Sequence, residues 1–295
     1  MISKEEEIRQ HPNHDAFCDV SNKKSMKSPL QVTVLGCGTS TGVPVIGCNC
    51  AVCSSNNPRN RRLRSSVWIS SIESLDSNSA SSSILFDATP DFRTQALTSG
   101  IKQLDGVFFS HAHADHVLGI EDLRILSFSH PDGLPVYGSE QTLEEIKKMF
   151  AYIFSPAKHH EGGKVANLRP QVILPGETII IGDISVQAIP IFHGNLPIFG
   201  YRIGSFFYAT DCSYIPEDSF SYLSGVSTLL IDGLRYEPHP THFSVKESIA
   251  VSNRIKPNKT YLTHMAHSIE YESLLATLPS SIEPAYDGLQ FLISD

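Results

Sequence analysis

The sequence predicts an α+β protein in which two mixed β-sheets face each other and helices cover the outsides, a four-layer αββα sandwich. Within residues 31–152, short apolar strands alternate with helical patterns. Between 171 and 208 the chain again consists of short apolar runs separated by Gly and Pro, and helical patterns return after 246. This order, with no linker between the two halves, favours two packed sheets in one domain at 31–295.

The elements follow from local residue patterns. Residues 140–152 place Leu143, Ile146, Met149 and Phe150 on one helical stripe, which predicts a helix packed on the core. Asp91 stands directly before a helical pattern, where an N-cap is expected. In chain order, strands are predicted at 31–35, 67–71, 83–86, 135–138 and 290–293, successive antiparallel strands at 171–208, and helices at 92–98, 117–128, 140–152, 246–253 and 270–276. The Gly-rich turn at 36–44 is expected near the site, and 76–81 reads as an exposed loop.

The composition and the N-terminal residues indicate in which cellular compartment the protein is expected. The 295 residues are 41% hydrophobic and 18% charged, and no run of eighteen apolar residues predicts a membrane span. Residues 1–30 contain an early acidic run and no apolar signal core, so we expect a flexible N-terminal leader and a cytoplasmic protein, with a nuclear location still open.

The net charge of −8 is a poor match to a long polyanion, so extended nucleic-acid binding is not expected and a small substrate is favoured. The basic run at 59–64 is interpreted as a solvated loop or, alternatively, as an anchor for an anionic substrate. Residues 154–166, with Lys158, His159 and His160, are irregular and are candidates for the border of the pocket.

A metal centre is predicted where the apolar run at 107–109 ends. His111, His113, Asp115 and His116 fall within six positions, and alternate residues of an extended chain point the same way. Without a metal ion, these crowded polar rings would each need a hydrogen-bond partner. Three further candidates follow apolar strands and complete a ligand set: His193, Asp211 and His264. Asp87, at the end of another strand, is expected to hydrogen-bond a ligating imidazole.

The six cysteines divide into a cluster and isolated residues. Cys48, Cys50 and Cys53 lie within six positions, and in a reducing compartment such clustered thiols bind metal more often than they pair. The remaining three are interpreted as ordinary small residues: Cys18, Cys37 and Cys212.

The frame HAHADH, followed by His193, Asp211 and His264 in this order, resembles the metallo-β-lactamase superfamily of hydrolases. Within it, GCNCAVC at 47–53 and THMAH at 263–267 resemble the cyclic-ribose phosphodiesterase of bacterial phosphonate breakdown. The likeness covers roughly 31–295 and implies the metallo-β-lactamase fold.

The resemblance also implies a ligand set. One divalent ion would be bound by His111, His113, His193 and Asp211, and a second by Asp115, His116, His264 and the same Asp211. Zinc and manganese both suit these ligands. A separate structural zinc would be bound by Cys48, Cys50, Cys53 and His267, with no coordination position left for water.

The chemistry that the resemblance implies is phosphodiester hydrolysis. A hydroxide bridging the two ions would attack phosphorus, and the ions would stabilise the nonbridging oxygens. His242 would act as a catalytic residue, protonating the leaving alkoxide or stabilising charge on the phosphoryl oxygens, and Asp115 is placed in the catalytic set as well as among the ligands. His239, three residues away, is the less favoured candidate for the role of His242.

Several alternatives stay open at this point. RNA 3′-end processing nucleases share the motif, although the sequence shows no long basic, Gly-rich arm for tRNA. An enzyme that hydrolyses a thioester or lactone could have the same histidine motif. So could a non-enzymatic protein that buffers metal or acts as a scaffold. The predicted partner is a small anionic phosphodiester: a cyclic ribose phosphate, a 2′,3′-cyclic nucleotide or a short oligonucleotide end. A homodimer is compatible with the sequence.

Overall fold

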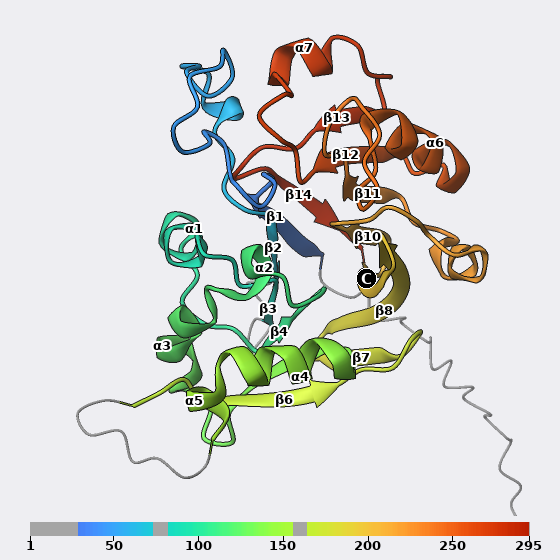
Figure 1. Cartoon of the computed structure of the whole chain (residues 1–295). Coiled ribbons are helices and arrows are strands. Elements are labelled where there is room, and N and C mark those ends of the chain that lie inside the picture. Colours follow the sequence, from blue (N-terminus) through green and yellow to red (C-terminus); the bar gives the residue numbers. More distant parts are fainter. Residues whose placement is uncertain (1–28, 73–81, 156–163, 295) are drawn as a thin grey trace, which may run out of the picture.

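The structure is a computed structural model that describes residues 29–72, 82–155 and 164–294 (Figure 1). Two seven-stranded sheets pack face to face. The first has the order β14 (Gln290–Ile293), β1 (Leu30–Gly36), β2 (Ser66–Ser71), β3 (Ser83–Phe86), β4 (Gly106–Phe108), β5 (Leu134–Gly138) and β6 (Leu168–Val172). The second has the order β13 (Ile282–Pro284), β12 (Lys259–Thr263), β11 (Thr228–Asp232), β10 (Phe206–Ala209), β9 (Leu196–Ile203), β8 (Ile184–His193) and β7 (Thr178–Ile181).

Both sheets are mixed, as predicted. Strands β3 to β6 run parallel in the first sheet, and β10 to β13 run parallel in the second. The other neighbours pair antiparallel. Because neighbouring parallel strands end at the same edge, the residues that follow β3 and β4, and those that follow β10, β11 and β12, are brought to one edge of each sheet.

Helices cover the two outer sides of the sheets (Figure 1). They are α1 (Phe92–Ser99), α2 (Ala114–Val117), α3 (Leu123–Ser127), α4 (Glu140–Met149), α5 (Ala151–Phe154), α6 (Val245–Ile255) and α7 (Tyr271–Leu275), with 3₁₀ turns at Pro58–Asn60, Ile120–Asp122 and Glu217–Leu223. Helix α4 packs on β5 and β6, and α6 packs on β11 and β12. The predicted four-layer αββα sandwich is therefore confirmed.

The core between the sheets contains aromatic residues from both. The ring of Tyr201 on β9 lies 5.1 Å from that of Phe86 on β3 and 5.5 Å from that of Phe108 on β4. Its hydroxyl donates a hydrogen bond to the carbonyl of Phe109, at 2.8 Å. A second core, which includes Val107 and Ile146, lies between the first sheet and its helices. Strand β4 is buried along its whole length, as expected of a parallel strand covered on both faces.

Two predicted helices are interrupted. The helix expected at 117–128 is replaced by α2, a 3₁₀ turn and α3, because the chain bends at Gly119 to donate a hydrogen bond to the Ala88 carbonyl. A Cβ on Gly119 would lie 1.9 Å from the Thr89 carbonyl oxygen, so only glycine fits this close approach. The helix expected at 140–152 breaks at Phe150 (φ −114°, ψ 41°), and Met149, predicted to face the core, is 46% exposed.

The predictions for two charged segments have different outcomes. Asp91 is the N-cap residue of α1, as predicted, although its side chain makes no capping bond. Its carboxylate instead accepts hydrogen bonds from the backbone N–H and the guanidinium of Arg64. The basic run at 59–64 is not a solvated loop, because Arg62 is only 1% exposed and Arg59 stacks on the rings of Tyr271 and Tyr286.

Other predictions have mixed outcomes. Strands β7 to β10 are antiparallel, as expected, but β6 joins the first sheet in parallel orientation. No helix in the described residues has both the length and the hydropathy needed to cross a bilayer. The loop at 76–81, residues 1–28 of the leader, Cys18, Lys158, His159 and His160 lie outside the described residues.

Candidate metal centre

The histidine motif occupies the turn between β4 and α2. Ser110 and His111 follow the strand, His113 is the extended N-cap residue of α2, and Asp115 and His116 lie in its first turn. The change from extended chain to helix turns these side chains toward one another at the edge of the first sheet.

The second sheet supplies the opposite side of the site. His193 is the last residue of β8, Asp211 is the second residue after β10, and His264 comes directly after β12. Asp211 (φ 52°) and His264 (φ 57°) adopt left-handed backbone conformations, as does Asp87 (φ 61°) after β3. Such conformations are costly for non-glycine residues and cluster at functional sites. After these bends the carboxylate of Asp211 lies 3.0 Å from the His264 ring, and that of Asp87 lies 2.8 Å from the His116 ring.

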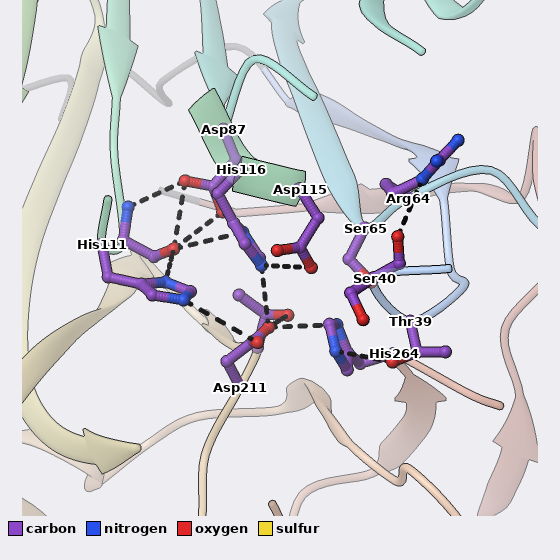
Figure 2. Close-up of polar contacts among 12 residues, drawn as sticks. Thr39, Ser40, Arg64, Ser65, Asp87, His111, Asp115, His116, Asp211 and His264 are labelled. Atoms are coloured by element: carbon purple, nitrogen blue, oxygen red, sulfur yellow. Dashed lines mark hydrogen bonds and ion pairs between the residues drawn. The ribbon is translucent and has the colours of Figure 1, made fainter. Parts of the chain in front are cut away.

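The ligand atoms of the seven candidate residues form two adjacent groups, and His242 joins His193 and Asp211 in a third that overlaps both. Those of His111, His113 and His193 lie within 4.8 Å of one another, as do those of Asp115, His116, Asp211 and His264. Figure 2 shows Asp211, a member of the second group, between His111 of the first group and His116 and His264 of its own. Its Oδ2 is 3.9 Å from His111 Nε2, and its Oδ1 is 3.1 Å from His116 Nε2 and 3.0 Å from His264 Nδ1. The seven side chains predicted to meet do meet.

The residues fit a pair of metal ions. Within the described part of the chain, His111 Nε2, His116 Nε2 and His264 Nδ1 are buried without a hydrogen-bond partner, although each faces Asp211. Leaving a buried polar atom unpaired costs about 1–3 kcal/mol, so three such atoms aimed at one carboxylate need an explanation. Divalent ions between the nitrogens and the carboxylate provide one, and imidazole with carboxylate suits zinc or manganese.

Hydrogen bonds to the second ring nitrogen orient three of the candidate ligand imidazoles. His116 Nδ1 donates to Asp87 Oδ2 at 2.8 Å, which is the contact predicted for Asp87. The Ser110 hydroxyl lies 3.0 Å from His111 Nδ1, and His193 Nδ1 donates to the carbonyl of Thr241 at 2.7 Å. Such partners fix the tautomer, and hence which ring nitrogen is free to bind a metal ion.

The same arrangement sets the protonation states. Burial lowers the pKa of His111 and His193, and it lowers that of His264 to about 4, so these rings are neutral at pH 7. Burial opposes ionisation of Asp211, but the nearby His264 and His116 outweigh it and hold the pKa of Asp211 well below its usual range. These three rings and the ionised carboxylate are in the forms that bind metal. Burial opposes protonation of His116, but the charges of Asp211 and Asp87 outweigh it and raise its pKa, so this ring must release a proton when a metal ion binds.

A buried histidine–aspartate pair adjoins the two groups. His242 Nδ1 donates to Oδ2 of Asp232, the last residue of β11, at 2.6 Å. The His242 ring is stacked on that of His264, with centroids 4.8 Å apart, and lies 4.6 Å from that of His193. His239 is farther out, 5.2 Å from His242, and its Nδ1 is occupied by Thr241.

The sequence reasoning missed several of these residues. Asp232 ends an apolar strand just as Asp211 follows one, so the residue pattern could have identified it. Thr39, whose hydroxyl lies 3.1 Å from His264 Nε2, comes from the Gly-rich turn that was expected near the site. Nothing in the sequence indicates the carbonyl of Thr241, because any residue supplies one.

The cysteine cluster forms a second candidate site with His267. The Sγ atoms of Cys48, Cys50 and Cys53 lie 3.4, 3.5 and 3.5 Å from His267 Nδ1. A tetrahedral zinc with Zn–S of about 2.3 Å and Zn–N of about 2.0 Å needs an S···N separation of roughly 3.5 Å. The Cys53 N–H donates to Cys50 Sγ and is the main cause that lowers the pKa of Cys50 to about 6. These four residues fit a closed structural zinc site.

Arg62 connects this cluster to the protein core. Its guanidinium donates to the carbonyls of Ala266 and Ile269, on either side of His267, at 3.2 and 2.9 Å. The neighbouring Leu63 N–H donates to Asp287 at 2.7 Å, and burial raises the pKa of Asp287 to about 7. The basic run therefore holds the cysteine loop against the segment that carries His264 and His267.

Comparison with known proteins agrees with this site. The family described as "Beta-lactamase superfamily domain" matches residues 82–265. The crystal structure of a diphosphatase from the PhnP family is 40% identical, with a TM-score of 0.78, and the match covers 89% of this chain and 97% of that one.

Two curated relatives are similar over part of their length. An octanoyltransferase of Porphyromonas gingivalis is 35% identical over 270 residues, which are 90% of this chain and 52% of the relative. A ribonuclease Z of Acaryochloris marina is 28% identical over 182 residues, 59% of this chain and 47% of the relative. The chain thus spans about half the length of these relatives. From the family match, the fold and the His/Asp clusters, we conclude that the chain belongs to the metallo-β-lactamase superfamily of metal-dependent hydrolases and resembles its PhnP family.

Proposed function

We propose that the protein is a dinuclear metal-dependent phosphodiesterase that hydrolyses a small phosphodiester, such as a cyclic ribose phosphate or a nucleotide. The observation that carries this proposal is the position of Asp211 between two groups of ligand atoms, beside the buried His242–Asp232 pair. Similarity to a PhnP-family diphosphatase supports hydrolysis at phosphorus.

Under this proposal, one ion is bound by His111, His113, His193 and Asp211, and the other by Asp115, His116, His264 and Asp211. Two divalent ions of zinc or manganese would attract the phosphoryl oxygens and lower the pKa of a water molecule toward neutrality. Asp115 Oδ2 lies 3.3 Å from His116 Nε2. The carboxylate of Asp115 serves as a ligand, and its remaining oxygen is available to accept a hydrogen bond from the attacking water.

The His242–Asp232 pair supplies the proton. Burial lowers the pKa of His242, but the hydrogen bond to Asp232 and its charge outweigh burial and raise the pKa. The ring therefore holds a proton on Nε2 while Nδ1 donates to Asp232. His242 is positioned to give the Nε2 proton to the leaving oxygen or to hydrogen-bond a phosphoryl oxygen. Asp232 acts as a positioning residue.

The cysteine cluster is proposed to hold a structural zinc through Cys48, Cys50, Cys53 and His267. His267 is three residues after His264, so this zinc would fix the turn that carries a ligand of the metal pair. Three thiolate ligands require a reducing compartment, which favours the cytoplasm.

The relatives suggest two other phosphorus-containing substrates for the same centre. The PhnP-family relative is a diphosphatase, which suggests cleavage of a diphosphate linkage at the same centre. The ribonuclease Z similarity suggests RNA 3′-end processing. The net charge of −8 argues against a long polyanion, whose binding depends on many Lys and Arg contacts. Thioester or lactone hydrolysis remains the alternative without phosphorus.

The test combines metal analysis of the purified protein with a substrate panel: bis(p-nitrophenyl) phosphate, a 2′,3′-cyclic nucleotide, a dinucleoside diphosphate, a precursor tRNA and an acyl thioester. We expect about three metal ions per chain and hydrolysis of the small phosphodiesters, with the tRNA left intact at physiological salt. Cleavage of the thioester without any phosphodiester would overturn the proposal.

Variants of the two neighbouring histidines test the role of His242. His242→Ala should lower kcat by about 10²–10⁴-fold while the metal content stays the same. His239→Ala is the matched control, since His239 lies beside His242 but outside both ligand groups, and should keep most of the activity. Unchanged turnover in His242→Ala would remove His242 from the mechanism.

A further inference from the structure

Thr210 lies between the end of β10 and Asp211, and its hydroxyl contacts the carboxylate that faces both groups of ligand atoms. Both residues are buried. Thr210 Oγ1 lies 2.7 Å from Asp211 Oδ1. Because an ionised carboxylate only accepts hydrogen bonds, the hydroxyl is the donor. The hydrogen of Thr210 therefore marks one of the two oxygens of Asp211.

The two oxygens of Asp211 have different surroundings (Figure 2). Oδ1 lies 3.1 Å from His116 Nε2 and 3.0 Å from His264 Nδ1, so it faces the second group. Oδ2 lies 3.9 Å from His111 Nε2, so it faces the first group. In this orientation the carboxylate offers one oxygen to each of the two proposed ions.

This orientation needs a restraint, because the torsion that turns an aspartate carboxylate has only broad preferences. Among the described residues, the other side chains within hydrogen-bonding or ion-pair distance of this carboxylate are the candidate ligands His111, His116 and His264. Their nitrogens would bind the ions, so they cannot also hold the carboxylate by hydrogen bonds. The Thr210 hydroxyl is free of that role and can keep its hydrogen bond to Oδ1 when metal is bound.

We propose that Thr210 is a positioning residue, which holds Asp211 in the orientation that gives one carboxylate oxygen to each ion of the pair. This inference rests on the metal pair of the proposed function and adds a residue that is not itself a ligand. It assigns the role to the hydroxyl, so valine, which has nearly the same shape without the donor, should not replace threonine.

Thr263 provides a matched comparison at an equivalent strand end. It is the last residue of β12 and directly precedes His264, as Thr210 directly precedes Asp211. Thr263 is also buried, but its hydroxyl lies 3.4 Å from that of Ser65. Thr263→Val therefore removes the same chemical group without removing a hydrogen bond to a candidate ligand.

The first measurement is the affinity for the metal pair, starting from the loaded, full-length protein. A chelator removes the ions in steps, and metal analysis after each step gives their affinities. In Thr210→Val we expect the affinity for at least one ion of the pair to fall about 10- to 100-fold, as is typical when the hydrogen-bond partner of a ligand is lost. Thr210→Ser keeps the hydroxyl and should restore the affinity, and Thr263→Val should leave it unchanged.

A spectroscopic measurement separates the orientation of Asp211 from a general loss of stability. When Mn²⁺ occupies both positions, ions that share a bridging ligand are magnetically coupled, and electron paramagnetic resonance detects this coupling. At full occupancy, Thr210→Val should change the coupled spectrum, whereas Thr210→Ser and Thr263→Val should retain it. Thr210→Ala, which also lacks the hydroxyl, takes the place of Thr210→Val if the valine variant does not fold.

The possible results distinguish this inference from the proposed function. Wild-type affinity and coupling in Thr210→Val, or equal changes in Thr263→Val, would show that the Thr210 hydroxyl does not position Asp211. Failure of Thr210→Ser to restore both would lead to the same conclusion. A wild-type protein without a coupled pair would overturn the inference even if it cleaves bis(p-nitrophenyl) phosphate and the other phosphodiesters. If the coupled pair depends on Thr210 as expected but no phosphodiester is cleaved, the proposed function is wrong and the role of Thr210 stands.

Discussion

Replacing Asp232 with Asn tests how the His242 proton is held. Asp232 Oδ2 accepts the His242 Nδ1–H at 2.6 Å, and Asp232 is fully buried. Asparagine has nearly the same shape but no charge, so it no longer stabilises a protonated imidazole. Asp232 belongs to neither group of ligand atoms, so the metal content should not change.

The size of the effect follows from the contact. A hydrogen bond to a charged group contributes about 1.5–3 kcal/mol. At about 1.4 kcal/mol for each factor of ten, its loss should lower kcat at pH 7 by roughly 10- to 150-fold. Because the hydrogen bond to Asp232 and its charge raise the pKa of His242, their loss lowers that pKa. The alkaline limb of the kcat profile, where His242 loses its proton, should therefore move to lower pH.

The assay is a pH–rate profile for wild type, Asp232→Asn, His242→Ala and the double variant. In the His242→Ala background, Asp232→Asn should lower kcat only slightly further, because the effects of substituting residues that act as a unit are not additive. Asp287→Asn is the control, since the Asp287 carboxylate accepts hydrogen bonds from the backbone N–H groups of Leu63 and Cys37 rather than from an imidazole of the centre. An unmoved alkaline limb in Asp232→Asn, or an equal loss in both backgrounds, would refute this reasoning.

Three further variants test the surroundings of the site. Cys50→Ser should remove one zinc equivalent in metal analysis and, in thermal unfolding, several kcal/mol of the stability that metal binding contributes. Cys37→Ser, outside the cluster, is the control and should keep the metal count. An unaltered count in Cys50→Ser would contradict the zinc assignment. Asp87→Asn replaces the charged acceptor of His116 Nδ1 with a neutral amide and should weaken metal affinity about 10- to 100-fold in a chelator competition. Equal affinity would show that the Asp87 carboxylate does not orient His116. Asp287 has a folded-state pKa raised to about 7, so its protonated form contributes stability that is lost as pH rises through 7. The unfolding free energy of wild type relative to Asp287→Asn should therefore fall by about 2 kcal/mol between pH 5.5 and 8 in urea titrations, and a pH-independent difference would argue against the raised pKa.

Much of the candidate site could be predicted from short sequence motifs. In His111, His113, Asp115 and His116, the spacing alone brings the side chains together, since extended chain and the first helical turn are local geometries. The clustered cysteines are similar, because three thiols within six residues have few other uses in a reducing environment. The layered fold also followed from the sequence, because strand and helix periodicities differ.

The helix boundaries and the basic run were predicted less well. The bend at Gly119 depends on the approach of the Thr89 carbonyl, and the burial of Arg62 depends on carbonyl acceptors at 266 and 269. Both contacts join residues distant in sequence. A run of charged residues indicates a solvent-exposed segment, unless it is known which distant residues accept hydrogen bonds from those charges.

By itself, the sequence determined which residues could bind metal and that two sheets would form, because residue type and periodicity are properties of short segments. Only the tertiary structure decided that Asp211 lies between His111 and His264, and that Asp232 accepts the hydrogen bond of His242. These relationships depend on the parallel pairing of β10, β11 and β12 and on the approach of the two sheets. Strand order and sheet packing arise from contacts over the whole chain, so short-range patterns cannot specify them.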